Sequence, residues 1–129
     1  MNGRFLLDTN IVIALFADDD AVKGKLSSAE EIFIPNVLVG ELIYVAYKSA
    51  RSEENLARIG EFAGNNVVLG SDLETARVYG EIKFRLQQKG RPIPENDIWI
   101  AAIAIQNDLI LVSRDVHFSE IDDLQMETW

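Results

Sequence analysis

The segment PENDIWIAAIAIQNDLILVSRD, residues 94–115, joins an apolar helix pattern directly to an apolar strand pattern. Residues 98–105 form the longest apolar run of the chain, and residues 109–112 form a short one of the kind found in buried strands. Outward from this segment, helical and extended patterns alternate along the whole sequence. Such alternation favours a parallel sheet with helices packed on both faces.

The remaining elements follow from apolar spacing and from capping residues. We expect strands at residues 5–8, 31–34, 67–69 and 109–112, with a further edge strand in the tail from Phe118 to Trp129. We expect helices at residues 10–17 and 21–28, from just after Asn36 to about residue 48 or 51, and at residues 53–62, 71–89 and 94–107. Expected caps are Thr9 or Asn10, Asn36, a capping box from Ser71 to Glu74, and Gly90. The prediction is one domain, residues 1–129, folded as a three-layer α/β/α sandwich.

Composition excludes several classes of site. The chain has no cysteine, so disulfides and thiolate chemistry are absent, and its one histidine cannot build a His-rich zinc site. A metal would be held mainly by oxygen, which favours Mg²⁺ or Mn²⁺. No secretory leader pattern or membrane-length apolar run is present, so we expect a cytoplasmic protein with no membrane association. The net charge of −9 argues at first sight against a nucleic-acid partner, although it does not exclude a local basic rim.

Four carboxylates interrupt apolar strings, namely Asp8, Glu41, Asp97 and Asp115. Removing a carboxylate from water costs several kcal/mol unless a positive charge compensates. Each acid has a plainer reading: Asp8 as a turn residue, Asp97 as a first-turn acid, Asp115 as a partner of Arg114. Glu41 is harder to explain, because no cation lies four residues on. A shared divalent cation would satisfy all four and indicates a metal-dependent hydrolytic site.

The expected topology brings these acids toward one edge of the sheet. Asp8 ends the first strand, Asp115 follows the last confident strand, and Asp97 starts a helix. Strand ends and helix starts meet where ligands bind in open α/β sheets. Glu41 reaches the same edge if its helix begins there.

The sequence resembles the PIN-domain family, and within it the VapC-like toxins of bacteria. The resemblance covers nearly the whole chain, in the family's order, and rests on LLDTN at residues 6–10, Glu41 in an apolar helix, IPENDIWIAA at residues 93–102 and LVSRDVHF at residues 111–118. It implies a small α/β/α ribonuclease that binds Mg²⁺ or Mn²⁺ through Asp8, Glu41, Asp97 and Asp115.

The resemblance also implies supporting residues and partners. Asn10 and Ser113 match positions that orient the acids by hydrogen bonding, and Ser113 stands where threonine is commoner. Glu41 could act either as a ligand or as a base that orients water. The implied partners are an RNA substrate cleaved by water and a small antitoxin, and a homodimer is expected.

The basic residues allow two interpretations. Lys48, Arg51, Arg85, Lys89 and Arg91 could position RNA through its phosphates, or could complement helix dipoles and solvate the surface. Together with the four acids, the resemblance to the PIN-domain family implies a metal-dependent endoribonuclease, the toxin of a toxin–antitoxin pair. The alternative is a catalytically silent PIN-like module that binds protein or RNA.

Two further side chains were weighed for a role in the site. His117 could bind phosphate or shuttle protons, but beside Phe118 it is interpreted as a structural contact. Trp99 is spaced for packing in the core or at a subunit interface rather than for base stacking.

Overall fold

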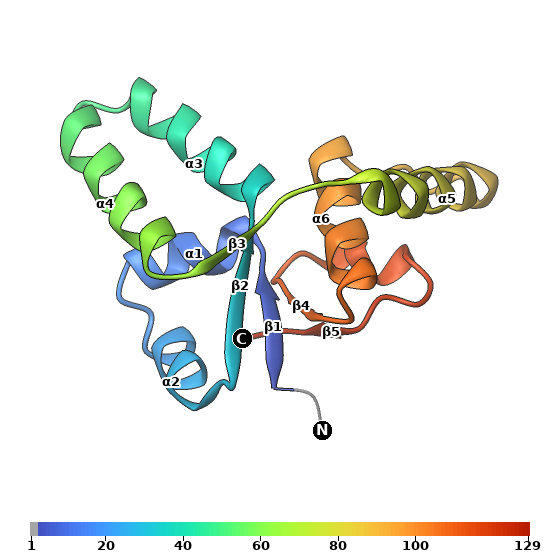
Figure 1. Ribbon diagram of the computed structural model, residues 1–129, viewed down its shortest axis with the longest axis horizontal. Helices are drawn as coiled ribbons and strands as arrows, with labels where there is room; N and C mark the ends of the chain where they lie inside the picture. Colours follow the sequence, from blue (N-terminus) through green and yellow to red (C-terminus); the bar gives the residue numbers. More distant parts are fainter. Residues whose placement is uncertain (1–2) are drawn as a thin grey trace.

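The computed structural model describes residues 3–129, and the predicted alternation of strands and helices is confirmed (Figure 1). The strands are β1 (Arg4–Leu7), β2 (Glu31–Pro35), β3 (Val67–Leu69), β4 (Ile110–Val112) and β5 (Met126–Glu127). The helices are α1 (Thr9–Phe16), α2 (Asp20–Ser28), α3 (Asn36–Lys48), α4 (Ser52–Gly64), α5 (Leu73–Lys89) and α6 (Glu95–Gln106), with a short 3₁₀ helix, η1 (Val116–Glu120). The edge strand expected in the tail is β5.

The five strands form one parallel sheet in the order β3-β2-β1-β4-β5. The chain moves outward from β1 to β3 on one side, then crosses back to place β4 and β5 on the other. Leu6 of β1 pairs with Phe33 of β2 and with Leu111 of β4. The direction of winding therefore reverses between β1 and β4, and the carboxyl ends of these two strands flank the crevice where such sheets bind ligands.

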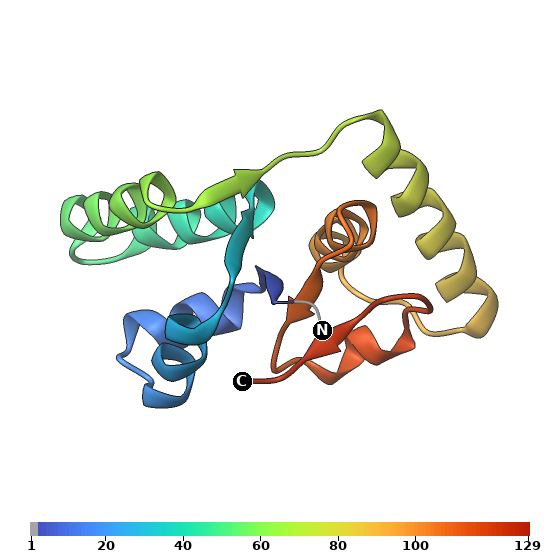
Figure 2. The same ribbon diagram turned by 60° about the horizontal axis from the view of Figure 1, so that its bottom comes forward.

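Helices cover both faces of the sheet, which gives the three layers expected (Figure 2). Leu6 points into the apolar cluster under α5, α6 and η1, whereas its neighbours Phe5 and Leu7 point into the cluster under α1 to α4. Successive side chains of a strand alternate between faces, so a strand buried on both sides must be apolar throughout. None of the helices described over residues 3–129 is both long and apolar enough to cross a membrane.

Two helices begin one residue earlier than expected, and their predicted N-caps were wrong. Asp8 occupies the N-cap of α1, in place of Thr9 or Asn10, and Pro35 occupies that of α3, in place of Asn36. In both cases the strand passes into the helix without a loop. Asp8 directly follows β1, and Pro35 is the last residue of β2. Neither cap residue makes a side-chain capping bond, and the side chains of Thr9 and Asn10 are left for other contacts.

The start of α5 also differs from the prediction, while its end agrees. The capping box is formed by Asp72 and Thr75 rather than by Ser71 and Glu74. The Asp72 carboxylate accepts the Thr75 N–H at 3.1 Å, and the Thr75 hydroxyl accepts the Asp72 N–H at 3.0 Å. Gly90 ends the helix at φ 67°, the left-handed conformation that favours glycine.

Candidate active site

Asp8 is the most deeply buried acid of the site, with 4 % of its surface exposed. It extends the ladder of β1, because its N–H donates to the carbonyl of Val112 at 3.0 Å. Its Oδ2 accepts a hydrogen bond from the Ser113 hydroxyl at 2.7 Å. Burial raises the pKa of the Asp8 carboxyl above its ordinary value, although the hydrogen bonds from Ser113 and the Thr9 N–H oppose the rise. The site therefore holds a carboxylate whose negative charge is poorly solvated.

Ser113, at the end of β4, links the strand ends. Its hydroxyl donates to Asp8 and accepts from the Asp115 N–H at 3.0 Å and from Asn10 Nδ2 at 3.3 Å. The Oδ1 of Asn10 accepts the N–H of Arg114 at 3.2 Å, and its Nδ2 lies 3.5 Å from Asp8. The two residues expected to orient the acids thus lie beside Asp8 and fix the loop that follows β4.

Asp97 lies in the first turn of α6, with 17 % of its side chain exposed. Burial raises the pKa of its carboxyl, and the negative charge of Asp8 raises it further, as does that of Asp115. The imidazole of His117 acts in the opposite direction. The contacts agree with this: Ser113 bonds to Asp8 and to the Asp115 N–H, and Asp97 and Asp115 offer ligand atoms within 4.8 Å of one another. The fold thus brings the ends of β1 and β4 and the start of α6 together.

His117 lies closer to the predicted ligands than the sequence indicated. Its ring does contact Phe118, with centroids 4.8 Å apart, but it also lies between two predicted ligands. Nε2 is 2.7 Å from Asp97 Oδ2, and Nδ1 is 2.7 Å from Asp115 Oδ1. The structural contact expected for His117 is confirmed, and the closeness of its ring to Asp97 and Asp115 is a further finding. Its spacing two residues after Asp115, within the segment 111–118, was the available signal.

Glu41 lies apart from this group. Its Oε1 accepts a hydrogen bond from the Thr9 hydroxyl at 3.1 Å, so it is tied to the residue next to Asp8. Within residues 3–129, the set of metal-ligating atoms that all lie within 4.8 Å of one another comes from Asp97, Asp115 and His117. Glu41 instead lines a groove between α1, α3 and α4, where it faces Thr9 and apolar side chains.

The donor set suits a divalent cation. Two carboxylates and an imidazole converge, and Asp8 adjoins them through the Ser113 hydroxyl. The Nε2 atom of His117 is buried but makes no aligned hydrogen bond, despite its closeness to Asp97. Burial and neighbouring acids raise the pKa values of Asp8 and Asp97, because their negative charges are poorly compensated within the protein. A bound cation would neutralise these charges.

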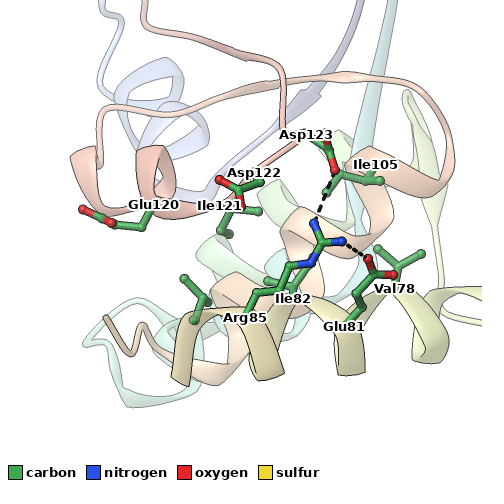
Figure 3. Close-up of a pocket in the computed structure, with 10 residues that line it drawn as sticks. Val78, Glu81, Ile82, Arg85, Ile105, Glu120, Ile121, Asp122 and Asp123 are labelled. Carbon is green, nitrogen blue, oxygen red and sulfur yellow. Dashed lines mark ion pairs between the residues drawn. The ribbon is translucent and has the colours of Figure 1, made fainter. Parts of the chain in front are cut away.

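Two of the basic residues predicted to meet RNA, Arg85 and Lys89, pair with acids that follow η1. Arg85 of α5 lies between Glu81 and Asp123, at 2.6 Å and 3.6 Å, on the wall of a cavity of about 110 Å³ (Figure 3). Lys89 pairs with Asp122 at 3.1 Å and donates to the Glu120 carbonyl at 2.7 Å. Both therefore tie α5 to the segment after η1.

The other three predicted RNA contacts lie on exposed surface. Arg51 is 3.8 Å from Glu54, and Lys48 lies over the ring of Tyr44, 4.3 Å from its centroid. Arg91 is exposed just after α5. Contacts of these three residues with RNA phosphates therefore stay predictions.

Comparison with known proteins identifies the family. The model of the PIN domain matches residues 5–124. The ribonuclease VapC2 of Haemophilus influenzae is 35 % identical over 98 % of both chains. The tRNA(fMet)-specific endonuclease VapC of Shigella flexneri is 36 % identical, again over 98 % of both chains. Among solved structures, DNA-bound VapBC from Salmonella typhimurium aligns at a TM-score of 0.92 and 30 % identity, covering 100 % of this chain and 99 % of that one.

These likenesses extend through the segments that carry the acids. The fold, with its winding reversal between β1 and β4, is that of the solved relative, and the sequence match runs from β1 to the segment before β5. The chain belongs to the PIN-domain family, and the relatives named here are VapC ribonucleases.

Proposed function

We propose that this protein is a metal-dependent endoribonuclease that acts as the toxin of a toxin–antitoxin pair. The observation that carries the proposal is the cluster of Asp97, Asp115 and His117, to which Ser113 links Asp8 at the crevice between β1 and β4. The relatives that match over nearly their full length are named as ribonucleases or RNA endonucleases.

Asp8, Asp97 and Asp115 would hold Mg²⁺ or Mn²⁺, with Glu41 either as a more distant ligand or as a base that orients water. When bound, such a cation supplies an activated water and charge stabilisation for hydrolysis of a phosphodiester. The chain's own groups prepare the site: Ser113 and Asn10 fix the orientation of Asp8, and Thr9 fixes that of Glu41. Fixed ligands lower the reorganisation needed when charge develops.

RNA is the proposed substrate. The endonuclease of Shigella flexneri is named for the initiator tRNA, so a structured RNA is a reasonable first substrate to test. We expect hydrolysis by water, which leaves 5′-phosphate and 3′-hydroxyl ends. The cytoplasm, where such RNA is found, is the proposed site of action.

The proposed protein partner is a small antitoxin, by likeness to the VapBC complex. A groove of about 260 Å³ between α1, α3 and α4 offers it a surface. Ile13 and Val45 line this groove although each is more than half exposed, and Glu41 lines it near the site. Exposed apolar side chains of this kind mark a protein interface. A homodimer is also proposed, as in the family resemblance.

The Asp8→Asn variant tests the activity. Purified protein is incubated with total RNA and with Mg²⁺ or Mn²⁺, and the cleaved ends are mapped. We expect wild-type cleavage that stops on chelation and falls at least about 100-fold in the variant, which keeps its fold by circular dichroism. If both leave RNA equally intact under all conditions, the alternative of a silent binding module is favoured.

A further inference from the structure

We propose that His117 is itself a ligand of the divalent cation, through Nε2, and that Asp115 orients its ring through Nδ1. The inference rests on the proposed function, and it adds a nitrogen donor to a site predicted from carboxylates alone. The two acids then have different roles. Asp97 and His117 both bind the cation, while one oxygen of Asp115 accepts a hydrogen bond from the imidazole.

The first observation is the pair of contacts made by the two ring nitrogens. Asp115 Oδ1 lies 2.7 Å from Nδ1 and also accepts the backbone N–H of His117 at 3.5 Å. A carboxylate accepts, and of the two ring nitrogens only Nε2 is buried without a hydrogen-bond partner, so we assign the hydrogen to Nδ1. Nε2 is then free to present a lone pair. A metal-ligating histidine typically donates its other N–H to a carboxylate in this way, which fixes both tautomer and ring orientation.

The second observation is the environment of Nε2. This atom is buried and has no aligned hydrogen-bond partner, yet the Oδ2 of Asp97 lies 2.7 Å away. Two lone pairs at this distance repel each other unless a positive charge lies against both. The separation is close to that of neighbouring donor atoms bound to one ion about 2.1 Å from each. The side chain of His117 is 26 % exposed, so the site is open to solvent on one side.

Packing holds the imidazole in this position. His117 lies in η1 next to Phe118, which is fully buried, and the two rings are in contact. Asp115 in turn is fixed by the bond between its N–H and the Ser113 hydroxyl. The chain that orients Nε2 thus runs from Asp8 through Ser113 and Asp115 to His117, and every link is a contact within the folded protein.

The consequence is a preference among metals. Mg²⁺ is bound by oxygen and retains several waters, whereas imidazole is a favourable ligand for first-row transition ions. A donor set with one imidazole should therefore bind Mn²⁺ more tightly than Mg²⁺. Removing the imidazole should weaken Mn²⁺ binding about tenfold or more and should change Mg²⁺ binding much less.

Pulsed electron paramagnetic resonance of bound Mn²⁺ tests the inference without measuring catalysis. We expect electron spin echo modulation from a directly bound ¹⁴N nucleus in the wild type, and its loss in His117→Gln. Calorimetry on the same samples should show the weaker binding of Mn²⁺ and the retained binding of Mg²⁺, since glutamine supplies an oxygen in place of Nε2. Ser119→Ala, an exposed residue of the same 3₁₀ helix, serves as the matched control and should keep the ¹⁴N signal.

The outcomes separate this inference from the proposed function. Tight Mn²⁺ binding without a ¹⁴N signal in the wild type overturns ligation by His117, and an imidazolium that merely bridges the two acids then explains the geometry. A signal that persists in His117→Gln overturns it as well. Absence of any metal binding, together with uncleaved RNA, counts against the nuclease itself. If His117→Gln unfolds, the wild-type spectrum alone still decides the ligation.

Discussion

A single hydroxyl, that of Ser113, serves three partners at the centre of the site. It donates to Asp8 and accepts from Asn10 and from the N–H of Asp115, which uses its whole hydrogen-bonding capacity. The side chain is fully buried, so no water can substitute for it. Sequence reasoning assigned Ser113 an orienting role by resemblance, but its link to the Asp115 backbone became visible only with the loop conformation.

Ser113→Ala should therefore lower both stability and activity. The Asp8 carboxylate, the Asn10 amide and the Asp115 N–H each lose a partner, and leaving a buried polar group unsatisfied costs about 1–3 kcal/mol. Chemical denaturation measures the loss of stability, and RNA cleavage in Mn²⁺ should fall at least about tenfold. Ser113→Thr keeps the hydroxyl and is the matched control, and near-wild-type values are expected for it. Equal effects of the two substitutions would show that volume, rather than the hydroxyl, matters at this position.

Asp8→Asn should make the metal-free protein more stable at neutral pH. Burial raises the pKa of Asp8, so the folded state binds this proton more tightly than the unfolded state does. The contribution of Asp8 to stability is fully present below its ordinary pKa of 3.8 and is lost as pH rises through the raised value. The ionised form at pH 7 therefore costs stability, and asparagine removes that cost.

Thermal unfolding in EDTA at several pH values measures this effect. The melting temperature of Asp8→Asn should exceed that of the wild type at pH 7, and the difference should shrink as pH approaches 4. Added Mn²⁺ should raise the melting temperature of the wild type more than that of the variant. A variant that melts lower than the wild type in EDTA at pH 7 would contradict the argument.

The site residues that sequence alone located are those in distinctive surroundings. Asp8 and Asp97 stand out because apolar strings frame them, and the parallel topology then places both at one edge. His117 is not framed in this way: its only signal is its spacing two residues after Asp115, and a histidine beside a phenylalanine is an ordinary packing motif. The position of its ring depends on η1, a 3₁₀ helix of 5 residues that no periodicity predicts.

At the scale of elements, the topology does most of the positioning. Each strand in the middle of the sheet ends at the site's edge, and α1 follows Asp8 without a loop. The sequence predicted the elements well because apolar runs and caps such as Gly90 are local signals. The predicted N-caps of α1, α3 and α5 were wrong. The first residue of a helix depends on where the preceding strand stops pairing and on which side chain bonds to the unpaired N–H groups of the first turn.

The groove between α1, α3 and α4 gives the prediction that belongs to this scale. Val45→Glu should abolish copurification of the co-expressed cognate antitoxin, because it places a charge where an apolar partner would pack. Val45 is 58 % exposed, so the melting temperature and RNA cleavage should stay near wild type. Leu73→Glu on α5 is the control, since Leu73 is 69 % exposed and lies outside the groove-lining set. If the antitoxin copurifies with Val45→Glu as well as with the wild type, the antitoxin does not bind in this groove.

The molecule as a whole is acidic, with a net charge of −9, while its proposed substrate is a polyanion. A resident divalent cation and the acids it neutralises would reduce the repulsion near the site. Arg85 and Lys89, two of the residues expected to contact phosphate, already pair with acids of their own chain. Few lysine and arginine side chains would therefore neutralise RNA phosphates, and few counterions would leave the RNA when it binds. Recognition of RNA would then depend on the bound metal and on RNA shape.

This charge balance predicts a weak dependence of cleavage on salt. A nuclease that contacts 6–10 phosphates loses about 10³- to 10⁵-fold in affinity between about 50 and 200 mM salt. Here kcat/KM, measured at constant Mn²⁺ over that range of KCl, should change less than about tenfold. Arg85→Ala and Lys89→Ala should leave the slope unaltered, because their partners lie within the protein, whereas Arg91→Ala tests an exposed cation outside those pairs. A steep fall that is relieved by Arg85→Ala and Lys89→Ala would restore them as RNA contacts and would show that their ion pairs open when the substrate binds.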